Sequence, residues 1–308
     1  MAQETGTTCQ QQGICIKPTY EESPLSTDLK SPVVLRAMTC DDLADAIELS
    51  LEQAWPHRAE DWELFLELGE GLVATLDDKV VGTIMAWRFG SDYATIGMVI
   101  VTNKIQGQGI GRKLMQAMLE RLDGLNVVLN ATAEGLPLYA KLGFEAYGEV
   151  RQHQGPAPTM PLADLMPGER VRPIGRSDAD LPALWSRASG MDRSNMFNAL
   201  WQGNKGVVLS RDHEPVGFAL LRRFGRGTSI APIVAPDLAG AKTLICHWLS
   251  ARAGKFCRID VVEGLGLSKW LEAEGLPCVG TVTTMVRGKP PVQQEGPQVF
   301  ALAAQALG

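Results

Sequence analysis

The feature that most constrains the fold is an internal repeat. Segment 71–90 returns as segment 206–225, with matching glycines and valines and the same closing triplet Arg-Phe-Gly, at a spacing of 135 residues (71 to 206). Further along, Gly143-Phe144 is matched by Gly275-Leu276 at a spacing of 132 residues. Single matches of glycine or valine arise easily by chance, but several pairs in order at nearly one period favour two copies of one fold.

The breaks between periodic segments predict the domain organisation. The start of the chain is rich in Gln, Thr, Ser and Glu and has no apolar period, which is typical of a flexible extension. Four prolines mark a linker between the two copies. The predicted divisions are an extension over 1–32, a first domain over 33–153, a linker over 154–168, a second domain over 169–289 and a tail over 290–308.

The first copy alternates strand and helix patterns. Helix 112–122 is the clearest, because Leu114, Met115, Met118, Leu119 and Leu122 form one apolar stripe and Gly124 ends it. The expected strands are 33–35, 72–76, 80–88, 95–101, 126–130 and 144–150, and the other helices follow Thr39, span 60–68 and span 136–142.

A glycine-rich turn, Gln106-Gly107-Gln108-Gly109-Ile110-Gly111-Arg112, joins strand 95–101 to helix 112–122. Exposed backbone N–H groups at a helix start bind phosphate oxygens, and glycine lets the backbone approach them closely. A P-loop is excluded because no G-x-x-x-x-G-K-[ST] string is present. A dinucleotide site would need glycine at Arg112 and an acidic residue where the chain has Asn130. A turn that binds nothing is the remaining alternative.

These residues resemble those of the GNAT superfamily of N-acetyltransferases. The turn, Gln106-x-x-Gly109-x-Gly111, is similar to the family's Q/R-x-x-G-x-G/A signature, although Asn103 stands where the family usually has proline. The segment Gly135-Leu-Pro-Leu-Tyr139-Ala-Lys-Leu-Gly143-Phe144 is similar to its P-L-Y-x-K-L-G-F segment. The resemblance covers residues 33–150 and, by architecture, extends to bacterial proteins that pair an intact domain with a degenerate one.

The resemblance implies an α+β fold of two tandem domains, each a central mixed, mostly antiparallel β-sheet flanked by helices. It implies acetyl-coenzyme A as co-substrate and no metal. The residues that it assigns to the cofactor are Val99, Ile100, Val101, Gln106, Gly107, Gln108, Gly109, Ile110, Gly111 and Arg112. By the same resemblance, Tyr139 is the general acid that protonates the departing thiolate, with a core packing role as the alternative.

The sequence leaves the general base open. Strand 95–101 contains no carboxylate, where some members of the family place one. His57, Asp61 and Asp92 lie on segments that border the expected acceptor site, and His57 is the candidate that we retain; a water chain is the alternative. Trp55, Trp62 and Trp87 are candidates for lining that site or for the core.

The second copy lacks the residues that the resemblance assigns to the cofactor and to catalysis. Residues 234–243 hold no Q-x-x-G-x-G pattern, and Leu271 takes the position of Tyr139. We therefore expect residues 170–288 to form a non-catalytic domain that shapes the acceptor pocket. Asp237, Asp260 and Glu263 are candidates there for binding a cation, with solvated loop charge as the alternative.

Composition and net charge limit the classes of ligand that the protein can be expected to bind. The net charge is −6 and the pI about 5.4, without a basic block, which argues against nucleic acid and favours a small cationic or neutral substrate. No apolar run approaches the ~20 residues of a membrane span. Six cysteines with no C-x-x-C pair and four scattered histidines predict reduced thiols in a cytoplasmic protein without a zinc site.

The sequence thus predicts acetyl transfer from acetyl-coenzyme A to a primary amine of a small molecule, by direct attack in a ternary complex. The alternative from another class is a coenzyme A-binding regulatory or scaffold protein without turnover. A nucleotide-dependent oxidoreductase is disfavoured by Arg112 and Asn130. The sequence does not specify the acceptor or the oligomeric state.

Overall fold

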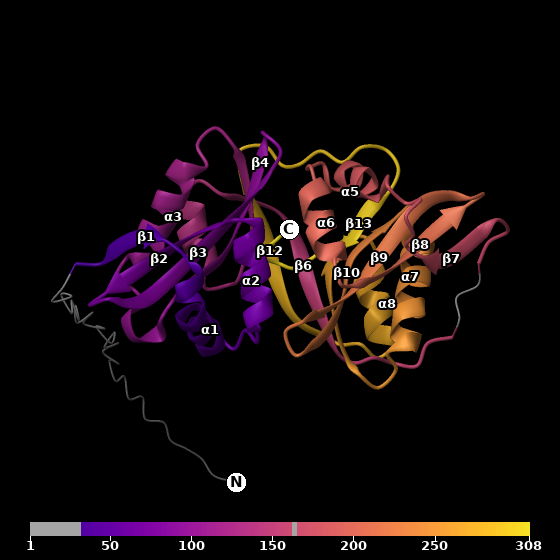
Figure 1. Ribbon diagram of the computed structural model, residues 1–308, viewed down its shortest axis with the longest axis horizontal. Helices are drawn as coiled ribbons and strands as arrows, with labels where there is room; N and C mark the ends of the chain where they lie inside the picture. The colour runs from indigo at the N-terminus through magenta and orange to yellow at the C-terminus, as the bar shows by residue number, and fades with distance from the viewer. Residues whose placement is uncertain (1–31, 162–164) are drawn as a thin grey trace, which may run out of the picture. The chain divides into compact units, whose positions relative to one another are not determined.

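The computed structural model describes residues 32–161 and 165–308 (Figure 1). The predicted extension 1–32 lies, apart from Pro32, outside the described residues. We refer to residues 33–161 as the first half and to residues 165–308 as the second half. No helix in the described ranges is long and apolar enough to cross a membrane.

The first half alternates strands and helices in the predicted order. Its glycine-rich turn leads into helix α3, whose predicted apolar stripe is buried against the sheet. Its elements are β1 (Val34–Ala37), η1 (Cys40–Asp42), α1 (Leu43–Glu52), α2 (Ala59–Leu68), β2 (Glu70–Leu76), β3 (Lys79–Phe89), β4 (Tyr93–Val101), η2 (Asn103–Ile105), α3 (Ile110–Arg121), β5 (Asn126–Ala131), α4 (Leu136–Lys141) and β6 (Glu145–Pro156).

The second half repeats this order. Its elements are β7 (Glu169–Pro173), α5 (Leu181–Ser189), α6 (Ser194–Trp201), β8 (Lys205–Arg211), β9 (Glu214–Phe224), β10 (Gly227–Ala235), α7 (Leu238–Ala251), β11 (Phe256–Val262), α8 (Leu267–Ala273), β12 (Cys278–Arg287) and β13 (Gln298–Ala301).

The internal repeat is also seen in the backbone conformation of two equivalent β-hairpins. The β2–β3 hairpin turns through Asp77 and Asp78, with φ of 49° and 61°. The β8–β9 hairpin turns through Asp212 and His213, with φ of 49° and 74°. Two successive residues with positive φ are the mark of a type I′ turn, whose twist suits a β-hairpin. The spacing of 135 residues read from the sequence is therefore the spacing of equivalent hairpins.

All strands belong to one sheet in the order β1-β2-β3-β4-β5-β12-β6-β11-β13-β10-β9-β8-β7. Most neighbours are antiparallel, and the parallel pairs are β4–β5 and β10–β11, so the predicted mixed, mostly antiparallel character is confirmed. Strand β12 of the second half lies between β5 and β6 of the first, and β6 in turn pairs with β11 (Figure 1). The two halves have exchanged their late strands.

This exchange alters the predicted divisions of the chain. The predicted linker 154–168 starts inside β6, which runs to Pro156. The predicted tail 290–308 contains β13, which pairs with β10 and β11 inside the sheet. Both differences have one cause: strands that pair across the two halves give no break in the sequence where their own half ends.

A shared core joins the halves. One buried cluster combines Trp62 and Phe65 of α2 with Trp185 of α5 and Phe218 of β9. Two further clusters lie beneath α3 and beneath α7, each built mainly from one half: Met285 joins the cluster of the first half, and Ala157 and Met160 join that of the second. Residues 33–308 accordingly form one compact unit.

Candidate functional site

The glycine-rich turn gives α3 an open start. Gly107 and Gly109 have φ of 81° and 79°, which favours glycine, and a Cβ at either would have no atom within 4 Å. Gly109 is the N-cap and offers no side chain to the helix. The first helical hydrogen bond runs from Lys113 N–H to the Gly109 carbonyl at 3.0 Å, so the N–H groups before it have no helical partner. An open helix start of this kind is chemically suited to an anion.

Strand β4 parts from β5 beside this turn. The parallel pairing covers only Tyr93–Ile96, opposite Asn126–Leu129. Beyond it β4 bulges at Met98, whose φ is 53° and whose carbonyl accepts a hydrogen bond from Thr83 Oγ1 at 2.8 Å. The edge of β4 from Gly97 onward is thus unpaired on its β5 side, with backbone groups available to a ligand.

A cleft of about 820 Å³ follows this open edge to the glycine turn; we call it the main cleft. It brings together nine of the ten residues that the sequence assigned to the cofactor: Val99, Ile100, Val101, Gln106, Gly107, Gly109, Ile110, Gly111 and Arg112. Gln108 does not line it, and its Oε1 is buried without a hydrogen-bond partner among the described residues.

The Gln106 side chain is engaged within the turn itself. Its Nε2 donates to the Val101 carbonyl at 3.0 Å and to Asn103 Oδ1 at 2.9 Å. Asn103, which replaces the expected proline, also accepts from Gln53 Nε2 at 2.9 Å. The two amides therefore fix the path of the turn.

Tyr139 of α4 lines the main cleft. Its ring meets Phe144 edge-on at 6.1 Å between centroids, and a Cβ at position 135 would lie 2.7 Å from the ring, so Gly135 makes room for it. Burial raises the pKa of Tyr139 to about 12. The phenol therefore keeps its proton at neutral pH and can donate it.

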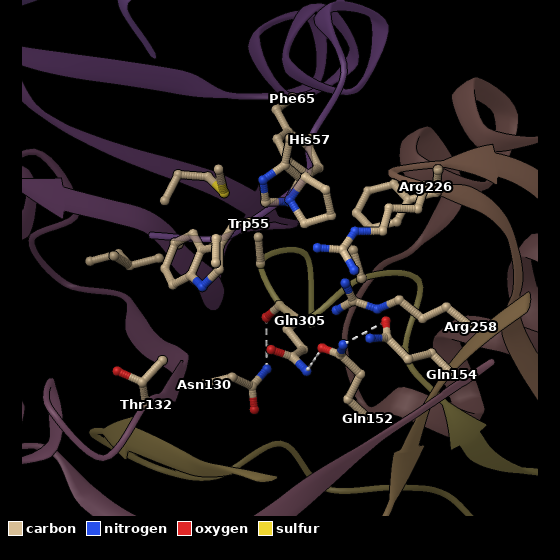
Figure 2. A pocket seen from close by; sticks show the side chains of 18 residues that line it. Trp55, His57, Phe65, Asn130, Thr132, Gln152, Gln154, Arg226, Arg258 and Gln305 are labelled. Carbon is tan, nitrogen blue, oxygen red and sulfur yellow. Dashed lines mark hydrogen bonds between the residues drawn. The ribbon is translucent and has the colours of Figure 1, made fainter. Parts of the chain in front are cut away.

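A second cavity, of about 150 Å³, opens beside the main cleft; we call it the side pocket (Figure 2). The two share Trp55, Ile96, Gly97, Met98, Asn130 and Thr132. Because the shared residues lie at the parting of β4 and β5, a ligand in the side pocket faces the open edge of β4.

His57 lines the side pocket in an aromatic setting. Its ring lies 5.7 Å from Phe65 of the first half and 5.6 Å from Phe224 of the second, centroid to centroid. Burial, with the charge of Arg258, lowers the pKa of His57 to about 4. The imidazole is therefore uncharged at neutral pH, and its Nδ1 has no partner among the described residues.

The second half supplies part of the side pocket through Phe224, Arg226, Arg258 and the segment Ala304–Ala306. Sequence analysis missed all of these. The matched Arg-Phe-Gly triplets point to the hairpin that carries Phe224 and Arg226, but not to the surface that it faces. Segment 304–306 lay in the predicted tail; it packs so closely against β4 that a Cβ at Gly97 would lie 2.8 Å from Ala306 Cβ.

The other first-half candidates have structural partners. Asp61 is buried, caps α2 and accepts hydrogen bonds from Arg58 and from Gly225 N–H at 2.9 Å. The Asp92 carbonyl accepts from Asn126 in a turn. Trp62 and Trp87 are fully buried in the core. None of these four lines either cavity, whereas Trp55 lines both.

The second-half carboxylates predicted for a cation are paired with arginines. Asp260 is 1% exposed and holds Arg258, with Nη2 at 3.0 Å from Oδ2. Glu263 lies 3.1 Å from Arg151 Nε, and Asp237 lies 2.8 Å from Arg211 Nη2. In the described part of the chain, no three His, Cys, Asp or Glu side chains are grouped so as to hold a metal ion.

The start of α7 differs from that of α3. Asp237 is its N-cap, and Asp237 Oδ1 accepts from Gly240 N–H at 2.7 Å. A carboxylate of the chain therefore occupies the helix start that in the first half is left to a ligand. Leu271 is fully buried in α8, so no phenol stands there.

Comparisons with known proteins agree with this duplicated arrangement. Models of an acetyltransferase (GNAT) domain match residues 46–159 and again residues 183–301. The chain is 28% identical over 269 residues to the uncharacterized N-acetyltransferase YitH of Bacillus subtilis, covering 85% of this chain and 94% of that protein.

Solved structures share the fold. A candidate acetyltransferase from Pyrococcus horikoshii superimposes with a TM-score of 0.75 at 22% identity, over 90% of this chain and 96% of that one. A tandem GNAT protein from the clavulanic acid biosynthesis pathway gives 0.59 at 11% identity, over 84% and 99%. With a GNAT model matched in each half, the chain belongs to the GNAT superfamily of N-acetyltransferases, in its tandem form.

Proposed function

We propose that the chain transfers an acetyl group from acetyl-coenzyme A to a primary amine of a small acceptor, in a ternary complex formed in the first half. The proposal rests on one observation: three features lie one after another along a single cleft. The open start of α3, the unpaired edge of β4 and the Tyr139 phenol line it in sequence, and the side pocket opens onto the same edge.

The glycine turn fits a diphosphate. The N–H groups of the turn have no helical partner. The space that a Cβ would occupy at Gly107 or Gly109 is empty, and Arg112 adds a positive charge to the lining. Gly107 to Arg112 would bind the diphosphate of coenzyme A, and the unpaired backbone of Val99 to Val101 would hydrogen-bond its amide-containing arm.

When bound, acetyl-coenzyme A supplies a thioester carbonyl that an amine can attack. The chain's part is to align the amine with that carbonyl and to donate a backbone N–H at the β4 bulge to the oxygen on which negative charge develops. As the new C–N bond forms and the C–S bond breaks, Tyr139 gives its proton to the sulfur. The acceptor's ammonium loses one proton to water before it attacks. A second proton leaves the nitrogen as the amide forms and, through water, restores the Tyr139 phenol.

His57 has a more limited role in this proposal than that of a strong base. With a pKa of about 4, it is a poor acceptor for the proton of an alkylammonium group, whose pKa is about 10. Its Nδ1 is buried and has no partner among the described residues, so in this proposal the ring lines the pocket and takes no part in proton transfer. The side-pocket lining contains no carboxylate among the described residues, so solvent is left to remove the proton.

The test pairs binding with turnover. Titration calorimetry of the full chain should give one acetyl-coenzyme A per chain and no binding of NAD. Incubation with a panel of primary amines should release free thiol, detected with a chromogenic disulfide. Tight binding without thiol release from any amine would instead favour the non-catalytic coenzyme A-binding protein, and binding of NAD in place of acetyl-coenzyme A would overturn the cofactor assignment.

A further inference from the structure

The side pocket is positively charged, whereas the protein as a whole is acidic. Arg226 and Arg258 both extend from the second half into the pocket (Figure 2). Arg258 is balanced by Asp260. Arg226, at the exposed tip of the β9–β10 hairpin, has no carboxylate within 4.0 Å among the described residues.

A third arginine stands behind these two. Arg222 is 3% exposed and donates to the carbonyls of Ala231 and Ala303 rather than to a carboxylate. The pKa of Arg222 is lowered to about 10 by burial, so it still carries its charge at neutral pH. The charges of Asp61 and Asp260 both act on Arg222. However, Asp61 is paired with Arg58 and Asp260 with Arg258, so the arginines here outnumber the carboxylates and the excess positive charge lies beside the cavity.

The remaining polar lining is uncharged. Asn130 Nδ2 donates to the Gln305 carbonyl at 2.8 Å, Gln305 Nε2 to Gln152 Oε1 at 3.3 Å, and Gln152 Nε2 to Gln154 Oε1 at 2.9 Å. This chain of amides crosses the pocket from β5 to β6 (Figure 2). It supplies hydrogen bonds but no negative charge that could neutralise the arginines.

The hairpin that carries Arg226 is anchored to the first half. Gly225 N–H donates to the buried Asp61 Oδ2 at 2.9 Å, and Arg58 Nη2 donates to the Arg223 carbonyl at 3.1 Å. The position of Arg226 at the pocket mouth is thus fixed by its neighbour rather than by a partner of its own side chain. A guanidinium on an anchored backbone, with no carboxylate partner of its own, is suited to bind an oxyanion from a ligand.

This charge is not needed for coenzyme A. The glycine turn that fits the diphosphate lines the main cleft and does not line the side pocket. The two cavities meet at Gly97 and Met98, on the open edge of β4. A ligand bridging the arginines and this edge would have its anionic end at Arg226 and its other end at the reaction centre.

Resting on the proposed function, we propose that the acceptor is a small amino carboxylate, whose carboxylate is bound by Arg226 and Arg258 and whose amine lies at the edge of β4. Its size follows from the cavity, since about 150 Å³ admits a ligand of roughly benzene size. The expectation of a cationic or neutral substrate, drawn from net charge, is replaced by a zwitterionic one.

The experiment compares matched ligands by binding, so that it does not depend on turnover. The full chain, saturated with coenzyme A, is titrated with glycine, β-alanine, L-alanine and L-serine, with the carboxamide of each, and with 2-aminoethyl phosphate. At least one amino acid should bind at least ten-fold more tightly than its carboxamide. Tightest binding of 2-aminoethyl phosphate would replace the carboxylate by a phosphate and overturn the proposal in that form.

Two arginines on the same hairpin give the matched variants. Arg226→Gln, at an exposed position, should reduce the preference for the carboxylate at least ten-fold, whereas Arg223→Gln, exposed but outside the pocket lining, should leave it unchanged. Equal binding of acids and carboxamides, binding of none of them, or an unchanged preference in Arg226→Gln would overturn the inference.

Thiol release distinguishes this inference from the proposed function. Amino acids that bind through Arg226 without releasing thiol would leave the anion site standing and remove the transferase. Rapid thiol release from neutral amines, insensitive to Arg226→Gln, would do the opposite.

Discussion

Each half contains a helix that follows a long strand, α3 in the first half and α7 in the second. The two helices differ in how their N-termini are capped. In the first half, Gly109 leaves the start of α3 uncapped and open. In the second, Asp237 caps α7 with its own carboxylate. A helix start attracts an anion in either case, and the sequence decides whether that anion is a ligand or a side chain. The acidic cap is thus one of the differences between the halves, together with the glycine turn that the second half lacks.

The largest expected effect comes from closing the open start. Gly109→Val places a β-branched residue at φ of 79° and fills the cradle, so acetyl-coenzyme A affinity should fall by about 10³-fold through lost charge-assisted hydrogen bonds. Calorimetry measures the loss.

Gly124→Val is the matched control for this change. Gly124 has φ of 81° and equally open surroundings but lies outside both cavities, so the variant should share the backbone strain and keep the affinity. If the two variants bind acetyl-coenzyme A equally well, the diphosphate site lies elsewhere.

The next effect concerns Tyr139, whose place in the second half is taken by Leu271. Tyr139→Phe keeps the ring and removes the proton donor, so kcat should fall by roughly 10²-fold with acetyl-coenzyme A affinity nearly unchanged. Tyr147→Phe, at a tyrosine that lines neither cavity, should keep the full rate. An unaltered kcat in Tyr139→Phe would reduce this side chain to a packing role.

A third test uses pH at the seam where His57 meets Phe224. The folded pKa of about 4 lies below the unfolded value of 6.5, because burial and Arg258 disfavour the charged ring. Between these values the unfolded chain binds more protons, so the free energy of unfolding should fall as the pH drops from about 6.5 towards 4. Denaturant unfolding across this range measures the slope.

His57→Leu should reduce that slope, because it removes one of the two imidazoles whose pKa burial lowers; His247 is the other. His213→Asn, in the exposed β8–β9 turn where asparagine tolerates positive φ, should keep it. Equal slopes in wild type and His57→Leu would show that other groups govern this range.

The smallest effect is expected from opening the capped half. Asp237→Ala should cost about 1 kcal/mol of stability through the lost cap and should not create a second cofactor site, because the glycine turn is missing as well. Asp180→Ala is the control, since Asp180 stands at the N-cap of α5 without a side-chain hydrogen bond. A second equivalent of acetyl-coenzyme A in Asp237→Ala would mean that the cap alone separates the halves.

Local sequence patterns were sufficient to predict many of the elements that the two halves share. The glycine turn, the stripe of α3 and the paired hairpins depend on residues close in sequence, and they lie where the sequence predicts. The side pocket depends on contacts between residues far apart in the sequence, such as Phe224 with His57 and Ala306 with Gly97. Alternation along a strand shows that it pairs but not with which strand, so the exchange of β6 and β12 was not predictable. Net charge is a poor guide to the acceptor for the same reason, because it does not fix the sign of the field in one cavity.

The exchanged strands also bear on how the chain is synthesised. The glycine turn and Tyr139 are synthesised early. Strand β5 gains its second neighbour only when Thr283 has been synthesised and can pair with Ala131. The part of the side pocket formed by Ala304–Ala306 is completed later still. The half that contains the main cleft is translated first, but its sheet is completed last. During that interval the edge of β5 is bare, and a bare strand edge is open to pairing with another nascent chain. Pairing of β12 with β5 removes this bare edge, so the last part of the chain completes the sheet of the half that precedes it.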